Sequence, residues 1–102
     1  MDDADLILRI EELAGHFVAD YNQIGRPFVA VHRGLAGDQW AAFVACHRGE
    51  WHGRTPLNEG ALMWRKAVDG FTTPRRALEG LRDTLITSLR GRKERLDATL
   101  SR

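Results

Sequence analysis

The sequence predicts a small α+β domain, with an antiparallel three-stranded sheet framed along the chain by an N-terminal and a C-terminal helix (α-β-β-β-α). Three observations support this class: apolar residues recur at helical spacing near both ends, two central segments read as strands around a glycine-flanked turn, and a third strand-like segment follows. A chain of 102 residues can bury one core but not two. We therefore expect residues 1–102 to form a single domain.

Residues 4–22 are expected to form the first helix. Its apolar stripe recurs every three or four positions at Leu6, Ile10, Leu13, Phe17 and Tyr21. Asp2 or Asp3 is placed to cap its start. The helix should end before the strand that follows, because Gly25 tolerates a left-handed turn and Pro27 pushes the residue before it toward extended geometry.

A hairpin is predicted next, with strands over 28–33 and 39–47. The intervening sequence GLAG has a glycine at each end, which suits a tight reversal. A turn centred there places Arg33 opposite Asp38, Val31 opposite Trp40, Val29 opposite Ala42 and His32 opposite Gln39.

Both faces of this hairpin are apolar, unlike those of an ordinary surface hairpin. The better core face holds Val29, Val31, Trp40, Val44 and Cys46. The second face holds Phe28, Ala30, Ala41, Phe43 and Ala45, with His32, Gln39 and His47 at its margins. An uncovered apolar face of this kind is typical of an association surface with a polar rim. We expect a protein partner or a second copy, as a homodimer, to cover it; the competing arrangement has the two helices sandwiching the sheet.

Residues 61–69 fit two structures. They alternate as a strand, but they also fit a helix capped by Thr55 with Pro56 at its first position. The strand is preferred, because two nearby glycines disfavour a helix and a two-stranded sheet alone is too small to be stable. Residues 48–60 hold three glycines and a proline and are expected to form a long loop.

The last helix has a clear start, with Thr73 as its cap and Pro74 at its first position. Its apolar stripe consists of Ala77, Leu78, Leu81, Leu85, Ile86 and Leu89. Gly91 is expected to end or kink it, with Leu96 and Leu100 continuing a weaker stripe into a charged C-terminal extension over residues 92–102.

Charge is distributed unevenly along the chain. Residues 1–25 hold six acids against one arginine, a net charge of −5, whereas residues 74–102 hold eight Lys or Arg against four acids, a net charge of +4. The simpler interpretation is that two oppositely charged terminal helices lie side by side; the other is a basic face for nucleic acid or an acidic partner. Arg75 and Arg76 oppose the helix dipole in the first turn, so with Arg82 they are the candidate anion-binding residues.

Nothing in the sequence announces catalysis, a metal or a cofactor. His32, Cys46, His47 and His52 are the candidate soft metal ligands, but the strand pattern separates the first three. Cys46 lies in an apolar run and is expected to be a small buried hydrophobe. With one cysteine, an acidic N-terminus and no apolar run of about 20 residues, we expect a cytoplasmic protein without a membrane partner. No small-molecule substrate is evident from the sequence.

The run MWRKAVDGFTTPRRALEGLRDTLITSL resembles the end of a HicB-type antitoxin domain. In that pattern a strand passes through Gly70 to Thr73 and Pro74, and Ala77 and Leu78 then open a leucine-striped helix. With the hairpin, the resemblance covers residues 28–90, and the long first helix departs from it. The resemblance implies a degenerate double-stranded-RNA-binding-like fold that neutralises a protein partner without catalysis. The predicted function is therefore a small binding protein, antitoxin-like or a phage- or mobile-element-encoded inhibitor; the alternative is a nucleic-acid-binding accessory domain that uses the basic last helix.

Overall fold

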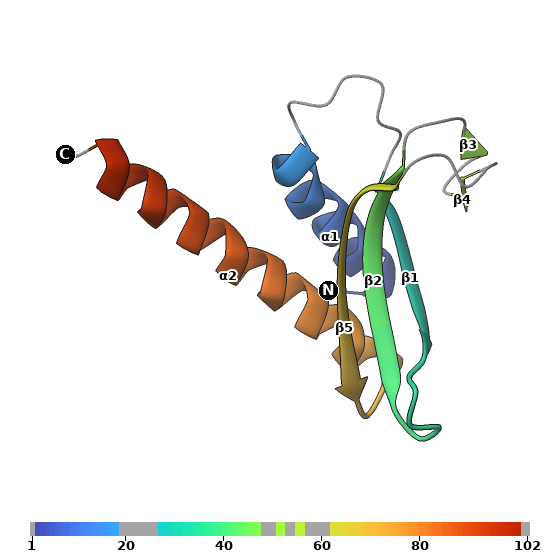
Figure 1. Cartoon of the computed structure of the whole chain (residues 1–102). Helices are drawn as coiled ribbons and strands as arrows, with labels where there is room; N and C mark the ends of the chain where they lie inside the picture. Colours follow the sequence, from blue (N-terminus) through green and yellow to red (C-terminus); the bar gives the residue numbers. More distant parts are fainter. Residues whose placement is uncertain (1, 19–26, 48–50, 53–54, 57–61, 101–102) are drawn as a thin grey trace.

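The predicted α-β-β-β-α order is confirmed by the computed structural model, which describes residues 2–18, 27–47, 51–52, 55–56 and 62–100 (Figure 1). Its elements in chain order are α1 (Asp3–Val18), β1 (Phe28–Arg33), β2 (Trp40–His47), β3 (Trp51–His52), β4 (Thr55–Pro56), β5 (Leu62–Phe71) and α2 (Pro74–Leu100). Strands β1, β2 and β5 form an antiparallel sheet in that order, and β3 pairs with β4 as a separate short hairpin.

Helix α1 begins at a side-chain cap. The Asp5 backbone N–H donates to Asp2 Oδ1 at 2.8 Å, and the Leu6 N–H donates to the Asp2 carbonyl at 3.0 Å. Asp2 therefore satisfies N–H groups that the first turn leaves without an intrahelical acceptor. The helix extends to Val18, and the predicted continuation over 19–22 lies outside the described residues.

Strands β1 and β2 pair two residues away from the predicted register. Val29 lies opposite Val44, Val31 opposite Ala42 and Arg33 opposite Trp40, and His32 lies opposite Ala41 instead of Gln39. The difference arises because the reversal extends to Gln39, whose carbonyl accepts the Gly34 N–H at 2.9 Å. A shift of two residues leaves every side chain on its predicted face, since faces alternate with a period of two.

Residues 62–71 form strand β5, so the strand interpretation of this segment is confirmed. Its ladder with β2 is interrupted between Trp40 and Ala42, where β5 contributes one residue more than β2. Gly70 adopts φ 87° at this bulge, a conformation that favours glycine, and its N–H donates to Asp69 Oδ1 at 2.7 Å. The predicted loop over 48–60 is described only at 51–52 and 55–56.

Helix α2 starts as predicted but continues further. The Arg76 N–H donates to Thr73 Oγ1 at 3.1 Å, which confirms the cap. The prediction that the helix ends at Gly91 is wrong, because the helix runs on to Leu100. A single glycine costs only about 1 kcal/mol relative to alanine, too little to end a helix that is already formed.

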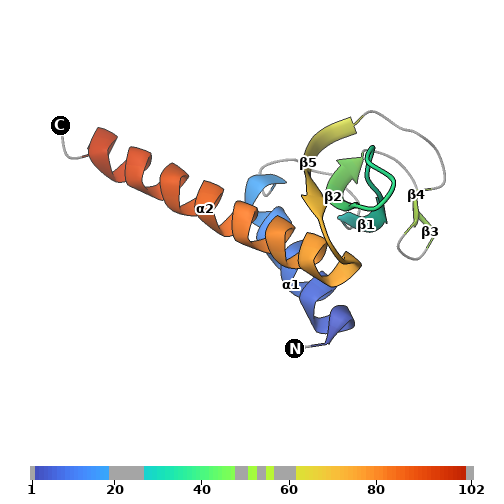
Figure 2. The same cartoon turned by 90° about the horizontal axis from the view of Figure 1, so that it is seen from below.

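Both helices cover the same face of the sheet (Figure 2). Their buried stripes meet the central strand in one core, which contains Leu6, Ile10, Leu13, Ala14, Ala42, Val44, Ala77, Leu78, Leu81 and Leu85. The sandwich arrangement is therefore wrong. Neither described helix is long and apolar enough to cross a membrane.

Three contacts between distant segments stabilise the helical layer. Arg75 donates to Asp3 Oδ1 at 2.9 Å, so the first turns of the two oppositely charged helices meet as the simpler charge interpretation predicts. At the other end, the Phe17 ring stacks on Trp64 of β5 with centroids 5.0 Å apart, and the Arg92 guanidinium lies 5.7 Å from the Phe17 ring. These contacts join α1 to both α2 and β5 within the helical layer.

Candidate protein-binding face

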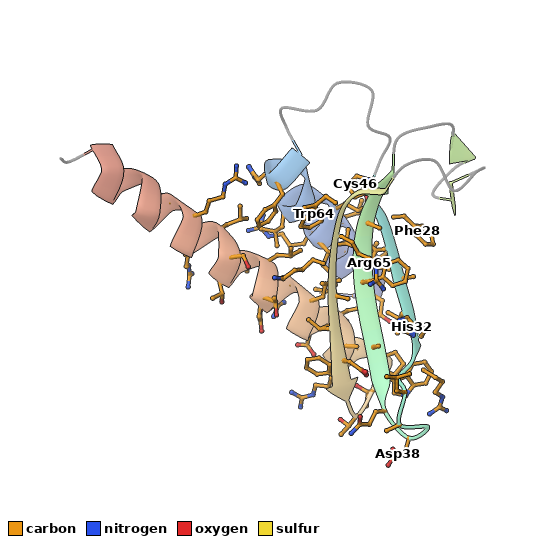
Figure 3. The ribbon with its side chains drawn as sticks, viewed as in Figure 1. Phe28, His32, Asp38, Cys46, Trp64 and Arg65 are labelled. Carbon is orange, nitrogen blue, oxygen red and sulfur yellow. The ribbon has the colours of Figure 1, made fainter. Side chains whose placement is uncertain are left out.

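The sheet surface turned away from the helices is the candidate site, and we call it the open face. Its described residues come from all three strands: Phe28, Ala30, His32, Ala41, Phe43, Ala45, Arg65 and Ala67. Figure 3 shows Phe28 and His32 pointing away from the helices, whereas Trp64 lies between the sheet and the helices. The structure thus brings the predicted binding residues together, except that the side chain of His47 lies outside the described part.

Phe43 is the centre of the open face. The Phe28 ring meets it edge-on, with centroids 5.9 Å apart and an interplanar angle of 63°. The His32 ring lies 5.8 Å from it, and the Arg65 guanidinium lies 4.9 Å from its centroid. Edge-to-face and cation–π geometries both suit the quadrupole of an aromatic ring, so these four side chains form one ordered cluster.

The alanines form the floor of this surface. Ala41 is 4% exposed and Ala45 is 1% exposed, although no described helix covers this side of the sheet. A methyl group lies low between strands about 4.8 Å apart, and larger side chains shield it. Ala45 lies opposite Phe28 on β1 and Arg65 on β5, so both neighbours overhang it. The result is a flat apolar surface with an aromatic centre.

Polar groups lie around this centre. His32 and Arg65 are exposed, and His32 Nδ1 lies 2.8 Å from the Arg33 carbonyl oxygen. Arg33 itself extends over the Trp40 ring at 4.4 Å and donates to the Gly37 carbonyl at 3.1 Å, so it braces the hairpin turn instead of the open face. Across the sheet, Asp69 accepts the Gly70 N–H. The margin therefore carries both signs of charge with no strong bias.

Arg65 is the residue that the sequence prediction omitted from this site. Strand alternation places Arg65 on the same side of the sheet as Ala67, and this alternation was the available signal. Its contact with Phe43 depends on the β2–β5 register, in which Phe43 lies opposite Ala67 and Ala45 opposite Arg65. That register joins segments some 20 residues apart, so local spacing does not reveal it.

Cys46 lies on the helix side of the sheet, opposite Trp64, and is fully buried. Burial raises the pKa of its thiol from 9.0 to about 11. A thiol held protonated is neither a nucleophile nor a metal ligand at neutral pH. The expectation that Cys46 is a small core residue is confirmed.

The described part of the chain contains no group of three or more His, Cys, Asp or Glu side chains able to hold a metal ion. His32 and Cys46 point to opposite sides of the sheet, since their strand positions differ in face. The side chains of His47 and His52 lie outside the described residues. No ligand set can therefore be assembled from the residues that the structure places.

The three predicted anion-binding arginines do not form one site. Arg75 pairs with Asp3, and Arg82 donates to Asp83 at 3.0 Å. Of the three, Arg76 has no acidic partner among the described residues. All three lie on α2, on the opposite side of the sheet from Phe28 and Phe43, so aromatic and basic groups do not share a surface.

A scan against protein-family models and searches of curated proteins and of solved structures find no match to this chain.

Proposed function

We propose that the chain is a small non-enzymatic binding protein that holds a protein partner on the open face and acts by occluding or tethering it. One observation carries this proposal: both helices pack on one side of a sheet that is apolar on both sides. An apolar patch of a few hundred Å² on a small protein is often a functional site. A protein partner would cover what the helices leave open.

The composition of the open face resembles the core and rim of an interface. Its centre is aromatic, with Phe28 and Phe43 in edge contact and the Arg65 guanidinium 4.9 Å from the Phe43 centroid. Its margin offers His32 and Arg65, and aromatic residues and arginine are enriched where interfaces bind most strongly. The partner surface we expect is apolar at its centre, with an acidic or hydrogen-bond-accepting group placed to receive Arg65.

The size of the face limits the partner element. Strands about 4.8 Å apart and rising about 3.3 Å per residue give three strands a projected area of roughly 300 Å². A stable interface buries about 800 Å² per partner, so one copy alone accommodates a single helix or strand pair.

Neutralisation of a partner by an antitoxin-like protein, and inhibition by a phage- or mobile-element-encoded protein, are two versions of this function. A reducing, cytoplasmic setting suits the single buried thiol of Cys46.

Protein is favoured over nucleic acid as the partner by the placement of charge. A single strand bound on the open face would need cations along its path, as well as aromatic rings for the bases. Arg65 is the one Lys or Arg among the described residues of that face, and its guanidinium already lies over Phe43. The basic residues of α2 lie on the other side of the sheet.

The proposal is tested by affinity capture from the source cell with three forms of the tagged chain: wild type, Phe43→Asp and Leu35→Asp. Leu35 is fully exposed in the β1–β2 turn, so its variant makes a comparable change away from the open face. We expect a protein that wild type and Leu35→Asp retain in equal amount and that folded Phe43→Asp loses. Capture of the same proteins in the same amounts by all three would refute the proposal.

A further inference from the structure

The two edges of the three-stranded sheet are unequal. Helix α2 packs against β5 so closely that the Phe71 ring occupies the space where Gly80 would carry a Cβ, and α2 projects outward past the β5 side (Figure 2). Beside β1 the structure describes no helix, and the short β3–β4 hairpin lies beyond its Phe28 end (Figure 1). Among the described strands, β1 pairs on one side only.

Strand β1 also lacks the features by which edge strands resist pairing. Its ladder with β2 runs over six consecutive residue pairs without a bulge, whereas the β2–β5 ladder is interrupted twice. Residues 28–31 are apolar and only partly buried, and the one Lys, Arg, Asp or Glu of the strand, Arg33, is its last residue. A regular edge of this kind can accept another strand, because backbone N–H and C=O groups that point away from the sheet can form a further ladder.

We propose that two copies of the chain associate through the outer edges of β1, antiparallel, with the twofold axis midway between Ala30 of one copy and Ala30 of the other. When the open faces of both copies lie on the same side of the joined sheet, residues directly opposite one another must point to that same side or both away from it. One residue must then lie opposite its own copy, with the axis midway between the two. Centred on Ala30, the pairing sets Val29 opposite the partner's Val31 on the helix side. On the open side it sets Phe28 opposite the partner's His32.

Neighbouring registers are poorer for identifiable reasons. With the axis at Val31, Arg33 would lie opposite the partner's Val29. With the axis at His32, Arg33 would lie opposite the partner's Val31. In both registers a charged residue would face an apolar one in place of the Val29–Val31 pair. Centring on Val29 would bring Pro27, which has no N–H to donate, into the ladder. The Ala30 register pairs β-branched with β-branched and aromatic with aromatic residues, the combinations that stabilise antiparallel strands.

Edge pairing and stacking of two open faces differ in what they leave accessible. Stacking would cover the open face of both copies, whereas edge pairing leaves both open faces on one side of the joined sheet. Edge pairing adds backbone hydrogen bonds and joins two sheets into one of six strands. If the proposed function holds, this continuous sheet doubles the apolar surface offered to the partner; the pairing itself does not depend on that function.

Cysteine cross-linking tests the register. Directly opposite residues have Cβ atoms about 4.5–5.5 Å apart, within reach of a disulfide after small adjustment. Ala30→Cys should therefore form a covalent dimer under mild oxidation. Ala67→Cys, exposed on the same face but on β5, should not. The native Cys46 is buried and does not interfere.

Sedimentation equilibrium supplies the second readout. We expect wild type and Phe43→Asp to dimerise alike, and Ala30→Lys, which sets two lysines opposite each other, to be a monomer with native circular dichroism. A wild-type monomer at all concentrations, or equal cross-linking of the two cysteine variants, would overturn the proposed pairing. Loss of the captured protein in a Phe43→Asp variant that still dimerises would show that the function and the pairing are separate properties.

Discussion

Replacing Gly80 with alanine should destabilise the protein, although alanine is the better helix former. Gly80 lies in α2 where the helix passes beneath the ring of Phe71. A Cβ at this position would collide with Phe71 Cζ and would lie 2.6 Å from Cε1 and 2.9 Å from Cε2. Because three atoms of one ring are involved, a small side-chain rotation does not relieve the overlap.

Two opposing effects set the magnitude. Alanine gains about 1 kcal/mol over glycine in a helix interior. Forcing an extra methyl group into a well-packed core costs about 1–3 kcal/mol. We therefore expect Gly80→Ala to lose up to about 2 kcal/mol of unfolding free energy, and each 1 kcal/mol corresponds to about 4–8 °C in Tm for a domain near this size.

Matched controls isolate the clash from helix propensity. A Cβ at Gly91 in the same helix, or at Gly15 in α1, would meet nothing within 4 Å. Gly91→Ala and Gly15→Ala should be neutral or stabilising by up to about 1 kcal/mol. Urea unfolding followed by circular dichroism measures all three. If Gly80→Ala proved as stable as Gly91→Ala, α2 would not contact β5 as described.

Three further predictions concern the cap, the thiol and the basic helix. Thr73→Ala should lower the unfolding free energy by about 1 kcal/mol, and an unchanged urea midpoint would contradict the cap. Native Cys46 should react slowly with a thiol reagent. Because its pKa rises from 9.0 to about 11 on folding, the unfolded thiol ionises first, so stability should fall between pH 9 and 11 and Cys46→Ala should remove that part of the loss. Replacing Arg75, Arg76 and Arg82 together by alanine should leave any retention on heparin unchanged; a large, salt-sensitive loss would favour the nucleic-acid alternative.

Local pattern was sufficient to predict the elements and the face of each strand residue. The β1–β2 register was wrong by two residues, yet Phe43 and Val44 lie on their predicted faces, because an even shift conserves the alternation. The strand over residues 62–71 could be predicted because a two-stranded sheet would be unstable, an argument about the whole sheet more than about that segment.

Long-range arrangement was less accessible. Each helix has one apolar stripe and the sheet has two apolar faces, so spacing alone permits either a sandwich or a single helical layer. The contact of Arg65 with Phe43 requires the β2–β5 register, and the extension of α2 past Gly91 depends on how little one glycine costs. These features are set by tertiary structure and not by periodicity.

The most direct test of the open face compares two neighbouring residues of β2. Phe43 points to the open face and is half-buried, whereas Val44 points to the helices and is fully buried. Phe43→Asp should keep native circular dichroism and lose about 1–2 kcal/mol, from its contacts with Phe28 and Arg65. Val44→Asp should not fold, since it would bury an unpaired carboxylate in the core. If Phe43→Asp also failed to fold, the face would be interior and the proposed binding surface would not exist.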